Sequence, residues 1–313
     1  MAKRNVVTVI STGGTISMVD KGTGAVPSLQ ARELLGEVPA DLQGVEIQIE
    51  HFSTIPSSHM TLEQLWSLQK TVSHRLDRLY VRGVVVTCGT DTMEEIAYLL
   101  DYTIPVDKCV VVTGAMRTAS EEGYEGKRNL WNAIRVALQP EADGRGAMIV
   151  ANDEIHAARY ATKTMSHNVG TFQSPGWGPM GHLFGTKIMW GWKLERDMLP
   201  VRALNPDVHL LSLTIGASET ILRHLIDQRV RGVVIEAFGA ARVPDWWVPI
   251  IEEAVQKGIY VVMASRTLHA YTHDNYGFAG AYRDLEKIGV IFAEGLSGAK
   301  ARIRLMCALG AVR

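Results

Sequence analysis

The sequence has few cysteines, almost no net charge and no long hydrophobic run. Its three cysteines, Cys88, Cys109 and Cys307, are odd in number and scattered, which argues against a disulfide framework. A formal net charge of −1 does not indicate binding to nucleic acid or to a membrane surface, so we expect neither partner. The longest apolar runs, such as residues 208–213, have the length of a strand and are too short to cross a bilayer.

The N-terminal residues also lack the pattern of an export signal. Residues 1–4 precede only a short strand-like run, which is too short for the hydrophobic region of a signal peptide and has no cleavage site after it. We therefore expect a cytoplasmic protein. The length of 313 residues, with 47% hydrophobic and 21% charged residues, is typical of a globular protein with two domains.

The most informative stretch of the sequence covers residues 83–100. Residues 84–87 favour a buried strand, and Thr92-Met93-Glu94-Glu95 fits a capping box at the start of a helix. The turn between them places Thr90 and Asp91 at the carboxyl end of the strand, where ligands bind in open α/β sheets. The alternative, that these residues only cap the helix, is equally compatible with an isolated T-D-T.

A second strand end repeats this chemistry near the N-terminus. Residues 5–10 (N-V-V-T-V-I) are expected to form another strand, and the sequence S-T-G-G-T-I at residues 11–16 follows it directly. Each of the two turns therefore places a threonine hydroxyl after a hydrophobic strand. We expect adjacent strands to bring Thr15 and Thr90 into one site.

The rest of the chain alternates strands and helices, which predicts βαβ units and parallel sheets. The predicted fold class is α/β with two doubly wound domains: a larger N-terminal parallel-sheet domain over residues 1–190, a linker over 191–206 and a smaller C-terminal α/β domain over 207–313. The further strands are expected at residues 45–52, 109–113, 147–151, 208–214, 232–237, 259–264 and 290–292. The helices are expected at residues 62–79, 129–138, 219–228 and 246–256, and from about residue 298 onwards.

Two segments near the expected site have distinct roles. The glycine-rich residues 17–28 are expected to form a loop that acts as a mobile lid over Thr15. Farther on, Thr61 and Gln64 fit a capping box for the helix that follows. That cap leaves the hydroxyls of Ser57 and Ser58 available for another purpose.

The order of the motifs resembles that of the bacterial-type L-asparaginase/glutaminase family. T-G-G-T-I near the start and G-T-D-T-M-E-E about 75 residues later look like the paired signatures of that family. The matches continue across nearly the whole chain with G-A-M-R at 114–117, N-D at 152–153, T-K-T at 162–164 and K-A-R at 300–302. Each match is weak by itself, but together and in this order they are specific.

The resemblance implies hydrolysis of L-asparagine to L-aspartate and ammonia by double displacement on a threonine. It implies that Thr15 is the nucleophile and that Thr90, Asp91 and Lys163 complete the catalytic set. The substrate-binding residues expected alongside them are Ser57, Ser58, Gly89 and Ala115. The family needs no cofactor or metal, and it implies a homo-oligomer, a dimer or a dimer of dimers, in which the partner's C-terminal domain completes each site.

The chemistry of amide hydrolysis is consistent with these roles. A threonine hydroxyl is a weak nucleophile and needs a neighbouring base. Lys163 could be that base if burial lowers its pKa, and Asp91 could orient the lysine and bind the α-ammonium group of the substrate. The backbone N–H groups of Thr15 and Thr90 are candidates for stabilising the oxyanion.

Three departures from the family pattern concern the site. The segment 17–30 has no tyrosine, Cys88 stands where histidine is usual, and residues 239–242 read G-A-A-R instead of carrying an asparagine. We expect Cys88 to be an inert thiol and not a nucleophile. We hypothesise that Tyr276 or Tyr282 supplies the missing phenol from the neighbouring subunit, the alternative being that both only pack an interface.

Three other functions stay open at this point. The chain could be a glutaminase-asparaginase, or the ammonia-producing subunit of an amidotransferase, which usually has an extra N-terminal domain. It could also be a non-catalytic protein that binds an amide amino acid on the same fold. Release of ammonia would distinguish the enzymes from the binding protein.

Overall fold

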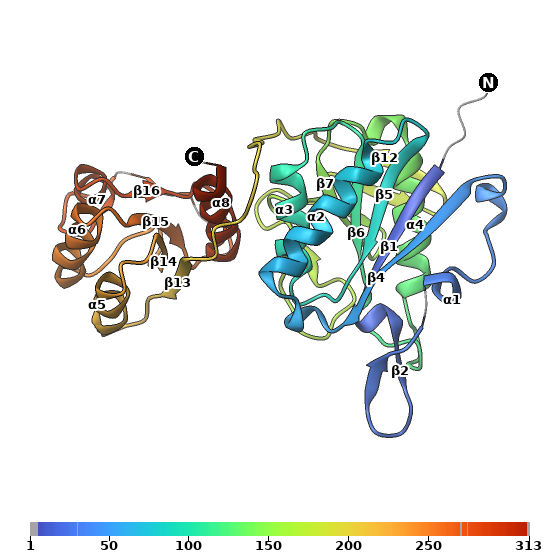
Figure 1. The fold of residues 1–313 in the computed structure, drawn as a ribbon, viewed down its shortest axis with the longest axis horizontal. Coiled ribbons are helices and arrows are strands. Elements are labelled where there is room, and N and C mark those ends of the chain that lie inside the picture. Colours follow the sequence, from blue (N-terminus) through green and yellow to red (C-terminus); the bar gives the residue numbers. More distant parts are fainter. Residues whose placement is uncertain (1–5, 30, 270, 274, 312–313) are drawn as a thin grey trace. The chain divides into compact units, whose positions relative to one another are not determined.

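The computed structural model describes residues 6–29, 31–269, 271–273 and 275–311. The chain divides into two compact units, Met1–Pro200 and Val201–Arg313 (Figure 1). Each unit has its own sheet and its own hydrophobic core. Both are built from alternating strands and helices, so the predicted α/β class is confirmed.

The first unit is organised around an eight-stranded sheet in the order β12-β11-β8-β7-β6-β5-β1-β4. Its parallel part consists of β1 (Val6–Gly13), β4 (Glu46–Ile55), β5 (Val81–Thr87), β6 (Cys109–Thr113) and β7 (Ala147–Ala151). The antiparallel edge consists of β8 (Glu154–Ala157), β11 (Gly181–Phe184) and β12 (Lys187–Trp190). β1 is buried along its whole length, which explains its continuous run of apolar and small residues.

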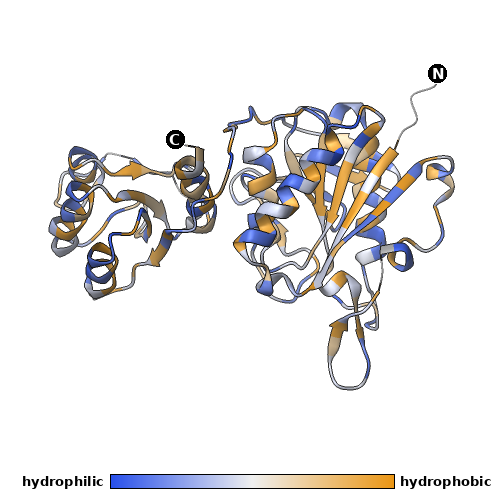
Figure 2. Cartoon of the chain, viewed as in Figure 1, coloured by the Kyte–Doolittle hydropathy of each residue, from blue (hydrophilic) through white to orange (hydrophobic). Residues whose placement is uncertain are grey.

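Helices cover both faces of this sheet (Figure 1). They are α1 (Ala31–Leu35), α2 (Leu62–Leu76), α3 (Met93–Thr103) and α4 (Gly126–Leu138), with 3₁₀ turns at Thr15–Ser17, Ala40–Leu42, Ser57–His59 and Pro140–Ala142. One core joins apolar side chains of α1 and α4, among them Leu34 and Leu130, to Val7, Val9 and Val85 of the strands. Figure 2 shows the result as orange strands inside the unit and blue residues on the outer helix surfaces.

The second unit has a four-stranded parallel sheet in the order β13-β14-β15-β16. Its strands are β13 (Val208–Ser212), β14 (Gly232–Ala237), β15 (Tyr260–Ser265) and β16 (Ile291–Phe292). Its helices are α5 (Thr220–Asp227), α6 (Val248–Gln256), α7 (Tyr282–Lys287) and α8 (Gly298–Ala311), with a 3₁₀ turn at Asp245–Trp247. The strands and helices predicted here are confirmed within one or two residues, apart from the 3₁₀ start before α6 and the unpredicted α7.

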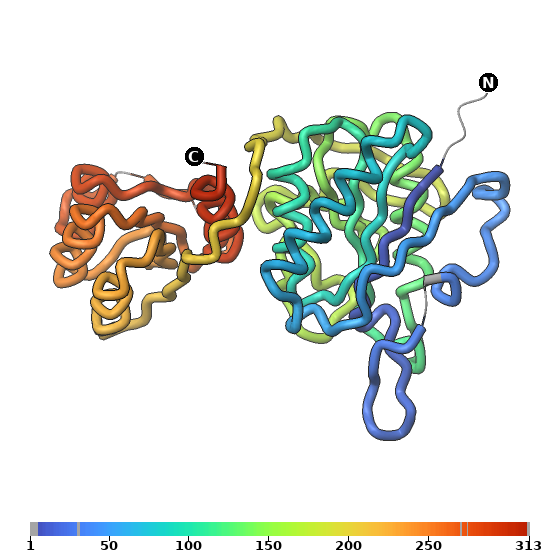
Figure 3. The backbone as a smooth tube through the Cα atoms, in the orientation of Figure 1, coloured from blue at the N-terminus to red at the C-terminus, as the bar shows by residue number. Residues whose placement is uncertain are grey.

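Several local predictions for the first unit are wrong; among the element boundaries, α4 begins at Gly126 instead of residue 129, and β4 ends at Ile55 instead of residue 52. The lid predicted as a loop is a hairpin of β2 (Met18–Asp20) and β3 (Ala25–Pro27), whose tip extends beyond the rest of the unit (Figure 3). The helix predicted to reach residue 79 ends at Leu76. Thr92 is the N-cap of α3, but its side chain makes no capping hydrogen bond, so the predicted capping box does not form. The capping box of Thr61 and Gln64 is confirmed.

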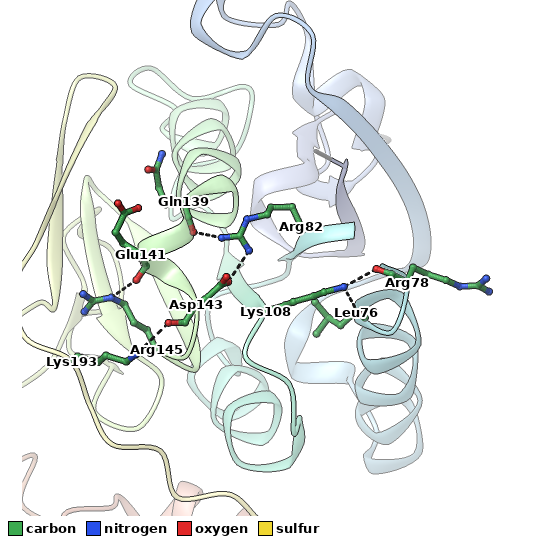
Figure 4. Close-up of polar contacts among 9 residues, drawn as sticks. All are labelled: Leu76, Arg78, Arg82, Lys108, Gln139, Glu141, Asp143, Arg145 and Lys193. Carbon is green, nitrogen blue, oxygen red and sulfur yellow. Dashed lines mark hydrogen bonds and ion pairs between the residues drawn. The ribbon is translucent and has the colours of Figure 1, made fainter. Parts of the chain in front are cut away.

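The two edges of the parallel sheet differ in chemistry. At the amino ends of the strands, Arg82 donates to Asp143 and to the Gln139 carbonyl, and Lys108 donates to the carbonyls of Leu76, the last residue of α2, and of Arg78 (Figure 4). These cations therefore satisfy backbone oxygens at helix C-termini, which is a stabilising role. The opposite edge, at the carboxyl ends of the strands, holds the residues predicted to be functional.

Candidate active site

The carboxyl ends of four neighbouring strands, β6, β5, β1 and β4, meet at one edge of the first sheet. The turn after β1 holds Thr15, and the turn after β5 holds Thr90. β1 and β5 are hydrogen-bonded neighbours, with Ser11 opposite Thr87. The expectation that adjacent strands bring the two threonine turns together is therefore consistent with the register.

The two turns touch through their glycines. Gly14 has φ +80° and ψ 178°, a conformation that a side chain strongly disfavours. A Cβ atom at Gly14 would lie 2.2 Å from the backbone nitrogen of Gly89, which shows how closely the backbones approach. Thr15 then begins a short 3₁₀ turn in which the Ser17 hydroxyl donates to the Gly14 carbonyl. This geometry leaves the Thr15 side chain half-buried, while Thr90 is buried.

Lys163 connects the second threonine to the acid beside it. Its ammonium Nζ donates to Thr90 Oγ1 at 2.9 Å and to Asp91 Oδ1 at 2.6 Å. The Lys163 side chain is 18% exposed, whereas that of Asp91 is 66% exposed. The lysine therefore lies inside the site, and the carboxylate is open to a soluble ligand. The set predicted from the motifs, Thr90 with Asp91 and Lys163, is close together in the structure.

Lys163 reaches this position from a separate two-stranded sheet. β9 (Thr162–Lys163) pairs antiparallel with β10 (Phe172–Gln173), and Phe172 lies opposite Lys163. The backbone N–H of Lys163 also donates to Glu94 Oε2 at 2.9 Å, so the first turn of α3 fixes the lysine backbone. Glu94 therefore supports the site, although its sequence context suggested only a capping box.

Ser57 packs against Gly89 in the turn that follows β5. A Cβ atom at Gly89 would lie 2.6 Å from the Ser57 hydroxyl oxygen, so the backbone at Gly89 approaches Ser57 closely. The Thr92 hydroxyl donates to the Ser57 carbonyl at 3.1 Å, which explains why it does not cap α3. Ser57 is buried, Ser58 is exposed, and Ala115 is buried just after β6.

Comparison with known proteins identifies the family. The model "Asparaginase, N-terminal" matches residues 6–196, and "Glutaminase/Asparaginase C-terminal domain" matches residues 207–313. The chain belongs to the asparaginase family. It is 31% identical to the L-asparaginase of Bacillus licheniformis, over 98% of this chain and 96% of that protein. It is also 31% identical to L-asparaginase 2 of Escherichia coli, over 97% of this chain and 88% of that protein.

A solved structure extends this similarity to the fold. It is described as a probable cytoplasmic L-asparaginase from Campylobacter jejuni, and it matches this chain with a TM-score of 0.89 and 31% identity. The match covers 98% of this chain and 96% of the other. The resemblance read from the motifs is therefore confirmed for the asparaginase family.

Cys88 differs from a reactive thiol in its burial and in the pKa of its thiol. It is completely buried at the end of β5, and its backbone N–H donates to the Thr113 carbonyl at 3.0 Å. Burial raises the pKa of the Cys88 thiol far above its ordinary value, which disfavours the thiolate. The expectation that this asparaginase-family protein does not use Cys88 as a nucleophile is thus consistent with the structure.

The two tyrosines proposed to act from a neighbouring subunit lie in the second unit. Tyr282 stacks on Phe292 with ring centroids 4.0 Å apart, which indicates a packing role for its ring. Tyr276 is 43% exposed, and the guanidinium of Arg242 lies 4.3 Å from its ring centroid. Of the two, Tyr276 therefore has the greater exposed surface for a contact with another subunit.

Among the residues that the structure describes, no group of three or more histidine, cysteine or acidic side chains could hold a metal ion. In the same residues, no helix is long and apolar enough to span a membrane. The described site offers the hydroxyls of Thr15 and Thr90, the carboxylate of Asp91, the ammonium of Lys163 and backbone N–H groups. These groups suit acyl transfer.

Proposed function

We propose that this protein is an L-asparaginase that hydrolyses L-asparagine to L-aspartate and ammonia with Thr15 as nucleophile. The observation that carries the proposal is the pair of hydrogen bonds from Lys163 Nζ, 2.9 Å to Thr90 and 2.6 Å to Asp91. They bring the lysine nitrogen within hydrogen-bond distance of a hydroxyl at the edge of the sheet where the turn after β1 carries Thr15. The names of the similar proteins support the same substrate.

The reaction proceeds by two displacements. In the first, the Thr15 hydroxyl attacks the side-chain carboxamide, its proton passes through the active-site groups to the leaving nitrogen, and ammonia leaves. In the second, water attacks the acyl-enzyme ester, and Thr15 regains its proton while L-aspartate leaves. A proton can be exchanged between Lys163 Nζ, which donates, and Thr90 Oγ1 during either step, because the two atoms are within hydrogen-bond distance. Backbone N–H groups of the two glycine-containing turns stabilise the oxyanion.

The substrate is held by its two α-substituents. Asp91 accepts the α-ammonium group through its exposed carboxylate, and Ser57 binds the α-carboxylate group, with Ser58, Gly89 and Ala115 lining the site. These anchors fix the distance from the α-carbon to Thr15. Glutamine is longer by one methylene, and a displacement of about 1 Å at the reacting carbonyl can lower the rate by roughly 100-fold. We therefore expect L-asparagine to be preferred over L-glutamine.

Glutaminase activity is the second candidate because two relatives carry the name glutaminase-asparaginase. One of them, from Pseudomonas fluorescens, is 30% identical over 97% of this chain and 88% of that protein. The experiment that tests both is kcat/KM for L-asparagine, D-asparagine and L-glutamine on one preparation. Ammonia release from L-asparagine supports the proposal, equal values for both L-amides remove the predicted preference, and no release from any of them refutes catalysis.

The assembly and the location of the enzyme are further parts of the proposal. We expect a cytoplasmic homo-oligomer, a dimer or a dimer of dimers, in which Tyr276 or Tyr282 reaches the site of a neighbouring subunit. Tyr276→Phe and Tyr282→Phe remove the hydroxyl and keep the ring. A fall of about tenfold in kcat, equivalent to about 1.4 kcal/mol, supports the role in trans. Wild-type kcat in both single variants and the double variant excludes it.

A further inference from the structure

The loop between β6 and α4, residues 114–125, is hydrogen-bonded to the segment that follows Thr15, residues 16–20. The Tyr124 hydroxyl donates to the Ile16 carbonyl at 2.5 Å. Two residues later, the Met18 carbonyl accepts from the Ala119 N–H at 2.9 Å. Two residues later again, the Asp20 N–H donates to the Ser120 hydroxyl at 3.0 Å. The loop therefore binds residues 16, 18 and 20 in succession.

These contacts lie on the edge of β2 that β3 leaves open. In the antiparallel pair of β2 and β3, Met18 is opposite Pro27, which has no N–H, and Asp20 is opposite Ala25. Their backbone groups point away from β3, and the loop supplies the partners that an edge strand otherwise lacks. β2 is thus held on two sides, by β3 and by the loop.

The phenol of Tyr124 is built into this position. Burial, and next the carboxylate of Glu125, raise the pKa of the Tyr124 hydroxyl above its ordinary value, so it stays a proton donor at neutral pH. A Cβ atom at Gly126 would lie 2.2 Å from the Tyr124 hydroxyl oxygen, although the backbone at Gly126 does not have a positive φ. Gly126 therefore provides the space that the phenol occupies.

The loop has its own internal supports. Glu125 accepts from the Met116 N–H, Arg117 donates to the Gly123 carbonyl, and Glu121 accepts from the Thr118 N–H. These bonds hold the loop in one shape, so Tyr124 is presented by a fixed element. In contrast, Gly13 and Gly14 give the turn before Thr15 little conformational preference of its own.

We propose that Tyr124 is a positioning residue for Thr15, which it serves by holding the adjacent Ile16 carbonyl and fixing the start of the β2–β3 hairpin. This inference rests on the proposed function, because it assigns Thr15 as the nucleophile. Tyr124 holds the residue that follows the nucleophile, from the β6–α4 loop of the same unit, in a protein whose hairpin has no tyrosine. Loss of the hydroxyl lets the Thr15 turn move, and a misplacement of about 1 Å can lower the rate by roughly 100-fold.

Two substitutions test this role, one by removing the hydroxyl of Tyr124 and the other by displacing it. Tyr124→Phe removes the hydroxyl and keeps the ring. Gly126→Ala keeps the phenol but displaces it, and alanine is the better helix former. For both variants we expect kcat for L-asparagine to fall by about tenfold or more while KM stays within about twofold, because no substrate-binding residue is changed. Tyr80→Phe, at a tyrosine that is 47% exposed, is the matched control and should keep the wild-type kcat.

Cleavage by trypsin after Lys21 gives a readout that does not depend on activity. Lys21 is exposed near the tip of the hairpin. We expect cleavage there, measured by peptide mapping, to be several-fold faster in Tyr124→Phe than in the wild type and in Tyr80→Phe. If Tyr124→Phe does not fold, Gly126→Ala decides the matter by the same two measurements.

The outcomes separate this inference from the proposed function. A wild-type protein that releases no ammonia refutes the proposed function, and the cleavage rates still report whether the loop restrains the hairpin. An active wild type together with unchanged kcat and unchanged cleavage in the folded variants overturns the role of Tyr124. A rise in KM without a fall in kcat in these variants overturns the role as well, because that result indicates a contact with the substrate.

Discussion

The close approach of the two glycine turns can be tested with Gly14→Ala. A side chain at φ +80° and ψ 178° costs roughly 1–3 kcal/mol in backbone strain. The added Cβ would also meet the Gly89 nitrogen at 2.2 Å and the Gly89 Cα at 2.3 Å, and such overpacking costs about another 1–3 kcal/mol. We therefore expect Gly14→Ala to lower the free energy of unfolding by about 2–6 kcal/mol.

Gly44→Ala is the matched control for this change. Gly44 has φ +87°, but a Cβ there would meet no atom within 4 Å, so alanine introduces the strain without the clash. Urea unfolding should show Gly14→Ala less stable than Gly44→Ala by about 1–3 kcal/mol. Because relief of the clash must separate the turns of Thr15 and Thr90, kcat should fall by roughly 100-fold in Gly14→Ala only. Equal stability and wild-type kcat in both variants would refute the close approach.

The other predictions concern single side chains. Lys163→Met should lower kcat by several orders of magnitude with the fold intact, since members of a catalytic set act as a unit; kcat near the wild-type value would remove the lysine from the mechanism. Cys88→Ala should keep most of the activity; loss of activity in this variant would show that the thiol has a functional role. Glu94→Ala removes the hydrogen bond that holds the Lys163 backbone, so kcat should fall while KM changes less; a change in KM alone would argue against a role of Glu94 in positioning Lys163. Hydrogen bonds from Arg135, together with its charge, lower the pKa of Asp41, so the pair stabilises the fold above the ordinary carboxyl pKa of 3.8 and stops doing so as the pH falls through the lowered value. Arg135→Gln should therefore cost up to about 1 kcal/mol in urea unfolding at pH 7 and less at pH 3; an equal loss at both values would contradict this.

Much of the site could be predicted because it depends on strand ends. Thr15 and Thr90 each follow a short apolar run, and parallel strands place such turns at one edge of the sheet. Lys163 could be linked to Thr90 only through the resemblance to the asparaginase family. The two residues are 73 positions apart, and β9, with only two residues, is too short for its sequence pattern to predict a strand.

Two of the wrong predictions fail because distant contacts override local patterns. Thr92 fits a capping box, yet its hydroxyl donates to the carbonyl of Ser57, 35 residues away. The segment expected to be a loop over Thr15 forms a hairpin whose free edge is paired by residues from the β6–α4 loop, about 100 positions later. Neither partner is visible from the local sequence, so propensity alone misassigned both segments.

The central claim is that Thr15 is the nucleophile of an L-asparaginase. Its most direct test is the rate of ammonia release from L-asparagine by Thr15→Ala beside the wild-type enzyme, with both proteins shown to be folded. The account predicts that the wild type releases ammonia and that Thr15→Ala is slower by several orders of magnitude. A folded Thr15→Ala variant that turns over L-asparagine at a rate near that of the wild type would contradict it.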